Sequence, residues 1–328
     1  MELRELTRKE FDSYALNHPL SSFQQTSSWG RFMEGDKFHA YYVGGFIKER
    51  LVGASLLLSY ERKKGKERLF YAPRGFLIDY KNEELLKEFT EEVKKFIIEK
   101  HGAFLKIDPY ILVRDRDNEG NIIEGGVYND FVEVNLTNAN FIKVNDKIQP
   151  KWLSRINLKE KTIDDIFNNF SPKARQTVRR NERLGFKVRD FDFKDIDKFI
   201  DIINEESKKY NTIVPTKTFY LDLKQTFDGN IKFMEVYFKK DEVTNNIDKM
   251  ISEVIKEKEV RINNYHNSKM TAGYFIDKEL EDEEEIKRLE SLKDYFSKCS
   301  DDVGMGIYMF ITIGNEVVAL NGGIVDEY

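Results

Sequence analysis

The residues best suited to chemistry in this sequence are a lysine and an aspartate at the end of one apolar run. They lie in the stretch Lys106-Ile-Asp108-Pro109. A carboxylate at the end of a strand can orient an amine or remove its proton. An Asp-Pro pair is also a common way to open a loop, so the spacing alone leaves both interpretations open. Asp108 is the candidate catalytic base and Lys106 a candidate substrate ligand.

A turn that carries an arginine follows an earlier apolar run, with the sequence Tyr71-Ala-Pro-Arg74-Gly75. A Pro-Arg-Gly turn can hold the guanidinium beside exposed backbone N–H groups, and both kinds of donor suit an anionic ligand. An ordinary surface turn would use the same residue types. Both interpretations stay open, with Arg74 as a candidate anion ligand.

The densest run of basic residues has the signals of a short helix. Ser171 suits the N-cap, Pro172 the first turn and Gly185 the stop. Arginines at every fourth position, namely Arg175, Arg179 and Arg183, share one face of such a helix.

This basic face suits phosphates, although a solvated stripe of charge is the usual alternative. The scarcity of acidic residues favours the functional interpretation, because only Glu182 interrupts seven basic residues from Lys173 to Arg189. The candidate phosphate ligands on this helix are Lys173, Arg175 and Arg179.

Composition limits the kind of protein. The 328 residues are 40% hydrophobic and 34% charged, which is typical of a globular chain of about two domains of ~150 residues each. The charged N-terminus does not resemble a signal peptide, and no apolar run reaches the ~18 residues of a membrane span. The single cysteine fits a reducing cytoplasm, and the net charge of −5 means that a local patch must meet any anionic partner.

Several reaction classes find no support in the sequence. There is no Gly-x-x-x-x-Gly-Lys-Ser/Thr loop, no Gly-x-Ser-x-Gly elbow and no His-Glu-x-x-His pair, and the four histidines lack ligand spacing. NTP hydrolysis, serine hydrolysis and zinc chemistry are therefore poorly supported.

The elements that must position these residues alternate between strands and helices. Residues 38–60 predict a β-hairpin, followed by a strand at 69–78, a helix at 82–100 and a strand at 103–107. A second hairpin at 308–320 matches the first and indicates a weak internal duplication, unless hairpins merely look alike. The other predicted elements are helices at 193–210 and 216–226 and a strand at 232–238.

Residues 239–300 differ in composition from the rest of the chain. They are rich in Lys, Glu and Asp, with apolar residues at spacings of three and four, such as Val243, Ile247, Met250 and Val254. Such narrow stripes favour an antiparallel two-helix coiled coil, with residues 263–273 as its tip. This segment is therefore expected to be an arm inserted into a sheet.

Five segments occur in one order and together resemble a known family: Phe23-Gln-Gln-Thr-Ser-Ser-Trp29-Gly30-Arg31, Tyr71-Ala-Pro-Arg74-Gly75, Leu105-Lys-Ile-Asp-Pro109, Gln149-Pro-Lys-Trp152, and Lys173-Ala-Arg175 through to Gly185. The joint pattern resembles the FemABX aminoacyltransferases of the peptidoglycan bridge, of the FemA, FemX and MurM type. The resemblance runs from the first residues to Tyr328.

The resemblance implies an α/β (α+β) fold with two GNAT-like acyltransferase lobes and a coiled-coil arm inserted in the second. The expected bounds are 1–153 for lobe 1, 154–238 plus 301–328 for lobe 2, and 239–300 for the arm. It also implies that Arg31, Arg74 and the helix from Lys173 to Arg183 bind the precursor pyrophosphate and the tRNA end, with Tyr220 lining the groove.

The implied reaction moves glycine, alanine or serine from aminoacyl-tRNA to the amine of a stem peptide or its bridge. The implied acceptor is lipid II or UDP-MurNAc-pentapeptide. No metal or organic cofactor is expected. The protein is expected to be cytoplasmic, with peripheral contact to the inner face of the membrane and a homo- or hetero-dimer with a relative as further expectations.

Two other functions compete with this one. A CoA-dependent GNAT-type N-acyltransferase shares the lobe fold, but its Arg/Gln-x-x-Gly-x-Gly/Ala turn is not found. A non-catalytic RNA-binding or scaffold protein would explain the arm and the basic helix but would leave residues 71–75 and 106–109 without a role.

The duplication carries one more expectation. The first hairpin is followed by a strand, a helix and a strand, whereas only five residues follow the second hairpin near Gly323. We therefore expect a C-terminally truncated chain with an incomplete second lobe and poor transfer.

Overall fold

The first sheet is built around the hairpin predicted at residues 38–60. Strands β2 (Phe38–Ile47) and β3 (Arg50–Glu61) pair antiparallel. The turn residues Lys48 and Glu49 have φ of 48° and 63°, as a two-residue turn of type I′ requires. This confirms the hairpin prediction.

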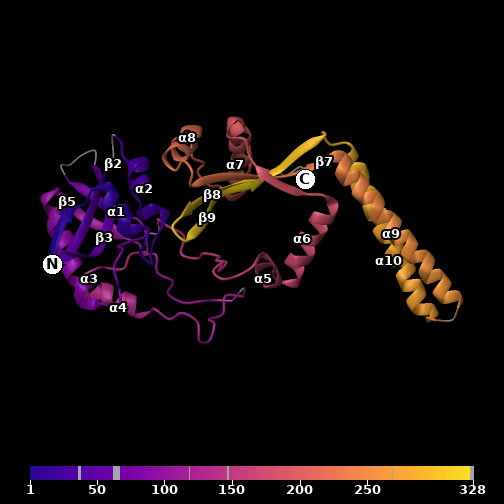
Figure 1. Cartoon of the computed structure of the whole chain (residues 1–328), viewed down its shortest axis with the longest axis horizontal. Coiled ribbons are helices and arrows are strands. Elements are labelled where there is room, and N and C mark those ends of the chain that lie inside the picture. The colour runs from indigo at the N-terminus through magenta and orange to yellow at the C-terminus, as the bar shows by residue number, and fades with distance from the viewer. Residues whose placement is uncertain (36–37, 62–66, 118, 146–147, 268, 326–328) are drawn as a thin grey trace. The chain divides into compact units, whose positions relative to one another are not determined.

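Three further strands complete this sheet in the order β1-β2-β3-β4-β5. β1 (Glu2–Glu5) is antiparallel to β2, and β4 (Arg68–Ala72) is antiparallel to β3. β5 (Gly102–Ile107) is parallel to β4, so the chain must cross over between them. Helix α3 (Glu83–Glu99), which the sequence predicts at residues 82–100, makes that crossover and begins at an Asn82 cap (Figure 1).

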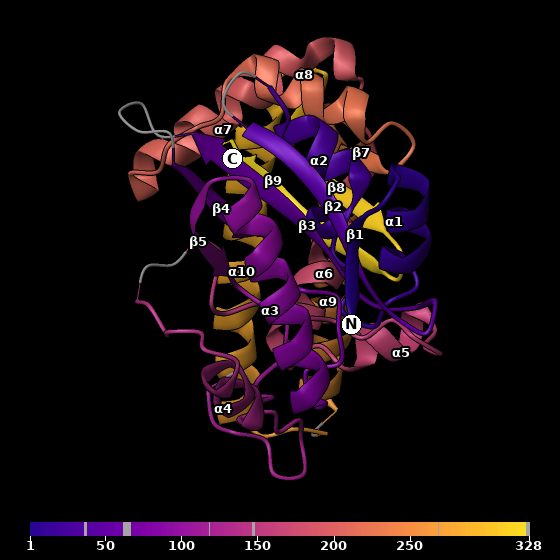
Figure 2. The ribbon, with the colours of Figure 1, turned by 90° about the vertical axis from the view of Figure 1, so that its left-hand side faces the viewer.

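Helices cover both faces of the first sheet because its strands alternate their apolar residues. Leu57 of β3 packs with Phe89 and Val93 of α3 on one face, and Figure 2 shows α3 lying along this sheet. Leu56 and Leu58 pack with Phe11 on the other. Phe11 belongs to α1 (Arg8–Ala15), which is followed by a 3₁₀ turn (Phe23–Gln25) and α2 (Ser27–Met33).

The structure of the protein is a computed structural model that describes residues 1–35, 38–61, 67–117, 119–145, 148–267 and 269–325. Its mixed α/β class, with helices and two sheets, agrees with the predicted class. It divides into two compact units. Unit 1 comprises Met1–Leu153, Pro215–Ile231 and Ile311–Val318, and unit 2 comprises Ser154–Val214, Lys232–Phe310 and Ala319–Tyr328.

This division differs from the parts expected from the sequence, because the arm belongs to unit 2 and two segments expected in lobe 2 belong to unit 1. Unit 1 also contains α8 (Lys217–Thr226) and the turn of the second hairpin, which were expected in lobe 2. Unit 1 further contains α4 (Phe131–Asn138). None of the helices in the described ranges is long and apolar enough to cross a membrane.

The second sheet has the order β6-β7-β8-β9. Its strands are β6 (Lys187–Asp190), β7 (Ile231–Lys239), β8 (Asp302–Ile313) and β9 (Glu316–Ile324). The helices of unit 2 include α5 (Ile163–Asn168), α6 (Pro172–Leu184) and α7 (Ile196–Tyr210), the last preceded by a 3₁₀ turn (Phe193–Asp195). The predicted second hairpin, the strand at 232–238 and the helices at 193–210 and 216–226 are thus present.

A long helical hairpin joins β7 to β8, where the sequence predicts the arm. Its helices are α9 (Lys240–His266) and α10 (Ala272–Ser297). Near the sheet they share an apolar core that contains Val243, Ile247 and Leu289. The 27 residues of α9 span about 40 Å at 1.5 Å per residue.

A buried carboxylate links the strands of the second sheet. Glu235 of β7 is 3% exposed and accepts from Arg189 Nε at 2.7 Å and from Lys198 Nζ at 2.5 Å. Arg189 also donates to both oxygens of Asp302 at 2.9 Å. A Cβ at Gly304 would lie 1.9 Å from the Glu235 carboxylate, so only glycine leaves room for this network.

We predict that Glu235→Ala destabilises the protein by roughly 2–3 kcal/mol, because two cations lose their buried partner. This is less than for a fully buried pair, since Arg189 and Lys198 are 38% and 43% exposed. Urea unfolding would measure the change. The control is Glu253→Ala, which breaks an exposed pair with Arg183 and should cost less than about 1 kcal/mol. Equal effects of the two variants would contradict the role assigned to Glu235.

Candidate active site

Asp108 and the turn at residues 73–75 meet because β4 and β5 are parallel neighbours. Tyr71 pairs with Lys106 and Ala72 with Ile107 in the sheet register, so both strands end at the same edge. Asp108 follows β5 directly. Its Oδ2 accepts from the Tyr71 hydroxyl at 2.8 Å, and its Oδ1 accepts from the Arg74 backbone N–H at 2.7 Å. One carboxylate therefore joins the ends of two strands.

The surroundings of Asp108 make its carboxylate more basic. Burial raises the pKa of Asp108, and this outweighs the hydrogen bonds from Arg74 and Tyr71 and the charges of Arg74 and Lys106, which act in the opposite direction. Burial and the neighbouring Asp108 charge also raise the pKa of the Tyr71 hydroxyl. Tyr71 therefore stays protonated and donates, while Asp108 is a proton acceptor.

Arg74 is held in an uncommon backbone conformation. Its φ is 56°, in the left-handed region that non-glycine residues rarely adopt. Its N–H is used by Asp108, and its carbonyl accepts from the backbone N–H of Tyr110 at 3.2 Å. The guanidinium carbon lies 5.0 Å from the centre of the Tyr110 ring. The Tyr110 hydroxyl donates in turn to Glu316 at 2.5 Å.

Gln25 fixes the other side of this turn. Its side chain is fully buried, and its Nε2 donates to the Pro73 carbonyl at 2.7 Å and to the Leu56 carbonyl at 3.3 Å. Its Oε1 accepts from the Leu56 N–H at 2.8 Å. A Cβ at Gly75 would lie 3.2 Å from the Gln25 side chain, so glycine lets the turn approach closely.

The structure brings together three of the predicted site residues, namely Asp108, Arg74 and Lys106. Gln149, from a segment quoted in the sequence analysis, also reaches this group and donates to the Tyr71 hydroxyl at 3.3 Å. Arg31 lies on a separate element, α2, where it is exposed and donates to Ser28 Oγ at 3.2 Å.

The expectation that Tyr220 lines a groove needs correction. Its side chain is fully buried on α8, beside the ring of Phe219. The apolar side of α8 packs into unit 1, and Tyr220 is buried there because it lies on that side. Its burial places this side chain in the core and not on the wall of an open groove.

The basic helix α6 of unit 2 has the predicted ends. Ser171 caps it, Pro172 opens it, and Gly185 with φ of 101° stops it. Two of its arginines have structural partners. Arg175 donates to the carbonyls of Asn168 and Phe170 at the end of α5, and Arg183 pairs with Glu253 of α9.

The remaining candidates on α6 are more accessible. Lys173 is exposed, and Arg179 is exposed with its guanidinium 5.3 Å from the centre of the Phe167 ring. The shared face that the spacing predicts is therefore only partly available to a phosphate.

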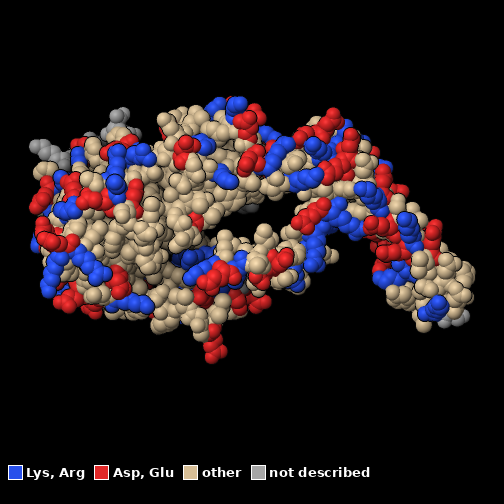
Figure 3. Space-filling view, viewed as in Figure 1, with Lys and Arg blue, Asp and Glu red and all other residues tan. Residues whose placement is uncertain are grey.

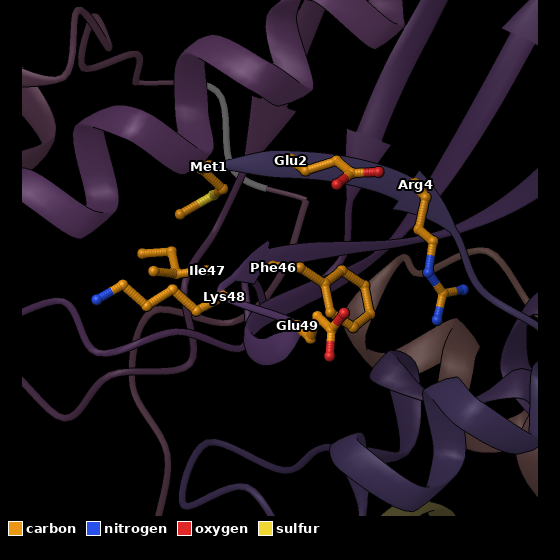
Figure 4. A pocket seen from close by; sticks show the side chains of 7 residues that line it. All are labelled: Met1, Glu2, Arg4, Phe46, Ile47, Lys48 and Glu49. Carbon is orange, nitrogen blue, oxygen red and sulfur yellow. The ribbon is translucent and has the colours of Figure 1, made fainter.

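A surface hollow in unit 1 is separate from these residues (Figure 4). In it the Arg4 guanidinium lies 4.5 Å from the centre of the Phe46 ring. Its lining, as described, contains none of the predicted site residues and consists of Met1, Glu2, Arg4, Phe46, Ile47, Lys48 and Glu49. Across the described part of the chain, no group of three His, Cys, Asp or Glu side chains is arranged to hold a metal.

Comparison with known proteins identifies the family. The model of the FemAB family matches residues 6–328. The chain belongs to the FemAB family. Aminoacyltransferase FemA of Staphylococcus aureus (strain bovine RF122 / ET3-1) is 27% identical over 305 residues, which cover 88% of this chain and 72% of FemA. FemA of strain NCTC 8325 / PS 47 matches with the same identity and coverage.

A solved structure agrees with this membership. The crystal structure of FemX matches with a TM-score of 0.69 at 18% identity, and covers 100% of this chain and 81% of the FemX chain. The two proteins share a fold. The family resemblance predicted from the five segments is confirmed.

Sequence reasoning missed four side chains that shape this site of the FemAB chain. Tyr71 and Gln25 lie inside segments that carry the family resemblance. A polar residue close to the end of a predicted strand was the signal that could have identified Tyr71. Tyr110 and Glu316 gave no signal, because 206 positions separate them in the sequence.

We predict that Gln25→Met destabilises the protein by about 2–4 kcal/mol, because the Leu56 N–H and the Pro73 carbonyl are left buried without partners. Chemical denaturation would measure the loss. Gln176→Met, at an exposed position of α6, is the control and should change stability by less than about 0.5 kcal/mol. A Gln25→Met protein as stable as the control would show that the turn does not need this anchor.

Proposed function

We propose that this FemAB protein is an aminoacyltransferase of peptidoglycan synthesis. It moves glycine, alanine or serine from an aminoacyl-tRNA to the amine of a precursor stem peptide or its interpeptide bridge. The observation that carries the proposal is the Asp108 carboxylate, which has a raised pKa and is fixed between Tyr71 and Arg74. Family membership and relatives named aminoacyltransferase FemA support the reaction class.

The reaction needs little beyond alignment and one proton acceptor. The amine nitrogen attacks the ester carbonyl carbon, a C–N amide bond forms, and the C–O bond to the tRNA ribose breaks. The amine loses a proton to Asp108, and the ribose oxygen gains one as it leaves. Because the ester is already activated, holding the two substrates together removes much of the barrier.

The protonation state of the acceptor amine explains why a base helps. A lysine-like amine has a pKa of ~10.4, so forming its neutral state at pH 7 costs about 4–5 kcal/mol. A half-buried carboxylate with a raised pKa is a stronger proton acceptor than a solvated one, so taking the proton of the ammonium costs less free energy. Asp108 has these properties, and Tyr71 and Arg74 keep its oxygens in place.

The cationic candidates supply contacts to phosphates. In unit 1 these are Arg74, Lys106 and Arg31, and on α6 of unit 2 they are Lys173 and Arg179, with Arg175 partly committed to the end of α5. A precursor pyrophosphate and the tRNA acceptor end are the anions we assign to them. The acceptor is lipid II or UDP-MurNAc-pentapeptide.

The remaining expectations belong to the same proposal. The two units correspond to GNAT-like acyltransferase lobes, α9 and α10 form an antiparallel coiled coil, and the protein works in the cytoplasm. A homo- or hetero-dimer with a relative is compatible with this assignment.

The proposal predicts transfer in a charged-tRNA assay. The protein is incubated with UDP-MurNAc-pentapeptide or lipid II and with tRNAs charged with radiolabelled glycine, alanine or serine. Label should move to the precursor with at least one of the three. Acetyl-CoA in place of tRNA tests the CoA-dependent alternative. No transfer from any charged tRNA, with RNA binding intact, would instead favour a scaffold.

We predict that Asp108→Asn lowers kcat by about 100-fold, because it removes the proton acceptor. In the native protein the rate should also fall as the pH drops through the raised pKa of Asp108, since protonation blocks its role. This additional acid limb should be absent from Asp108→Asn. Tyr71→Phe should move the limb to higher pH, because its hydrogen bond holds that pKa down.

The matched control is Asp222→Asn, an exposed aspartate on α8 of the same unit. It should leave both kcat and the pH profile unchanged. Thermal melts of all the variants separate catalytic loss from unfolding. An Asp108→Asn protein that folds and retains the native rate and acid limb would rule out Asp108 as the base.

A further inference from the structure

The end of the helical arm differs in charge from the rest of the chain. Residues 262–276, which we call the arm tip, contain one charged side chain among fifteen, Lys269, and no Asp or Glu. The chain as a whole is 34% charged. The tip is instead rich in tyrosine, phenylalanine, isoleucine and methionine, and Figure 3 shows a mostly uncharged surface at that end of the arm.

Ring stacking and hydrogen bonds join the described residues of the arm tip. Tyr265 and Phe275 stack with ring centres 4.4 Å apart and planes inclined by 13°. Two backbone hydrogen bonds hold the described part of the turn: Asn267 N–H donates to the Asn263 carbonyl at 3.1 Å, and Lys269 N–H donates to the Asn264 carbonyl at 2.9 Å. Thr271 caps α10. A turn with its backbone groups paired can enter a medium of low polarity at little cost.

Apolar side chains around the tip remain in solvent. Tyr274 is 53% exposed and Ile276 56%, and Leu280, one turn further along α10, is 57% exposed. Ionic side chains occupy the space between the helices at this level, where Lys258 pairs with Glu279 at 2.9 Å and Arg261 pairs with Asp282. At the level of these ion pairs the contact between the helices is ionic, and the three apolar side chains lie largely in solvent, unlike those of the apolar core at the base of the arm.

The charge of the rest of the arm, which we call the shaft, limits the kinds of partner that can bind the tip. Residues 277–297 of α10 carry nine acidic and four basic side chains. Such a shaft repels polyanions and anionic lipid surfaces along its length. Within the arm, the acid-free tip is the part suited to approach an anionic surface, and it would do so end-on. Its content suits a lipid interface, where tyrosine and apolar side chains partition together and a lysine meets the headgroups.

We propose that the arm tip is a membrane-contact element that docks in the headgroup region of an anionic bilayer. Tyr265, Tyr274, Phe275 and Ile276 provide the apolar contact, and Lys269 provides the ionic one. A single small tip gives weak, reversible binding. The role of this docking in catalysis rests on the proposed function. An enzyme docked on the bilayer would meet a lipid-linked acceptor there, so the proposal favours lipid-linked over soluble precursors.

Two other partners fit the observations less well. Nucleic acid needs several cations along its backbone, whereas the tip has one lysine and adjoins an acidic shaft. A second copy of the arm would bring two acidic α10 helices close together, which costs energy unless the contact is confined to the tips. Both alternatives appear as outcomes of the test.

The test is cosedimentation of the full chain with vesicles of phosphatidylglycerol and phosphatidylethanolamine, compared with vesicles of phosphatidylcholine alone. Native protein should bind the anionic vesicles better. Ile276→Asp and Tyr274→Asp should each lower the partition coefficient on the order of tenfold, because each puts a charge into the apolar contact. Ile255→Asp is the control: it adds the same charge at a shaft position that is 44% exposed and should leave binding unchanged.

Transfer kinetics connect the tip to the acceptor. Tip variants should raise KM for lipid II in vesicles several-fold and leave kcat and KM for soluble UDP-MurNAc-pentapeptide unchanged. Vesicle binding without transfer to either acceptor would contradict the proposed function but not the tip assignment. Transfer without vesicle binding, or equal binding by Ile276→Asp and the control, would overturn the tip assignment alone.

Two further measurements identify the alternatives. Analytical ultracentrifugation without lipid would show self-association that Ile276→Asp abolishes, if the tip were an interface between copies. Titration with tRNA would show affinity lost in the tip variants, if it were an RNA contact. Either result together with absent vesicle binding would reject the bilayer proposal.

Discussion

The parallel pairing of β4 and β5 is the constraint on which the candidate site depends. Parallel neighbours end at the same sheet edge, so the turn after β4 and the aspartate after β5 must share space. The Asp108 carboxylate uses both its oxygens to fill that space, and it holds Arg74 at a φ of 56° that the residue would not adopt alone. Gln25 secures the turn from the opposite side. The raised pKa of Asp108 follows from the same burial that makes the turn rigid, so structure and basicity have one cause.

The sequence predicts the elements of this arrangement better than their contacts. Local signals identify the hairpin at residues 38–60, the helix at residues 82–100 and the helix between Ser171 and Gly185, because turns, caps and apolar periodicity act within a few residues. Local signals also identify Arg74 and Asp108 as candidate site residues, each from its own segment. The bond between them depends on strand register across α3, and the bond from Tyr110 to Glu316 joins residues 206 positions apart. No local pattern encodes either one.

The basic helix and Tyr220 show which contacts residue spacing and family resemblance do not predict. A repeat of four residues correctly places arginines on one face of α6, but it cannot show that the end of α5 lies within reach of Arg175. The orphan carbonyls of that short helix need donors, and a nearby guanidinium satisfies them. Tyr220 is a large aromatic on a helix with an apolar side, and its burial contributes to the core. In both cases a side chain whose chemistry would suit ligand binding contributes instead to the structure, through a helix cap for Arg175 and through core packing for Tyr220.

The contact between the two helices of the arm changes in character along its length. Close to the sheet, Val243, Ile247 and Leu289 bury apolar surface, and this is where the two helices gain their stability. Further out the contact becomes ionic, through Lys258 with Glu279 and Arg261 with Asp282. Partly buried ion pairs add little net stability but penalise any sliding of one helix past the other, because a shift leaves charges unpaired. The register fixed in this way brings Tyr265 against Phe275 and leaves the apolar residues beside them exposed. Tyr274 and Ile276 are more than half exposed, so they add little to the contact between the helices, which depends at this end on the ion pairs and the ring stack.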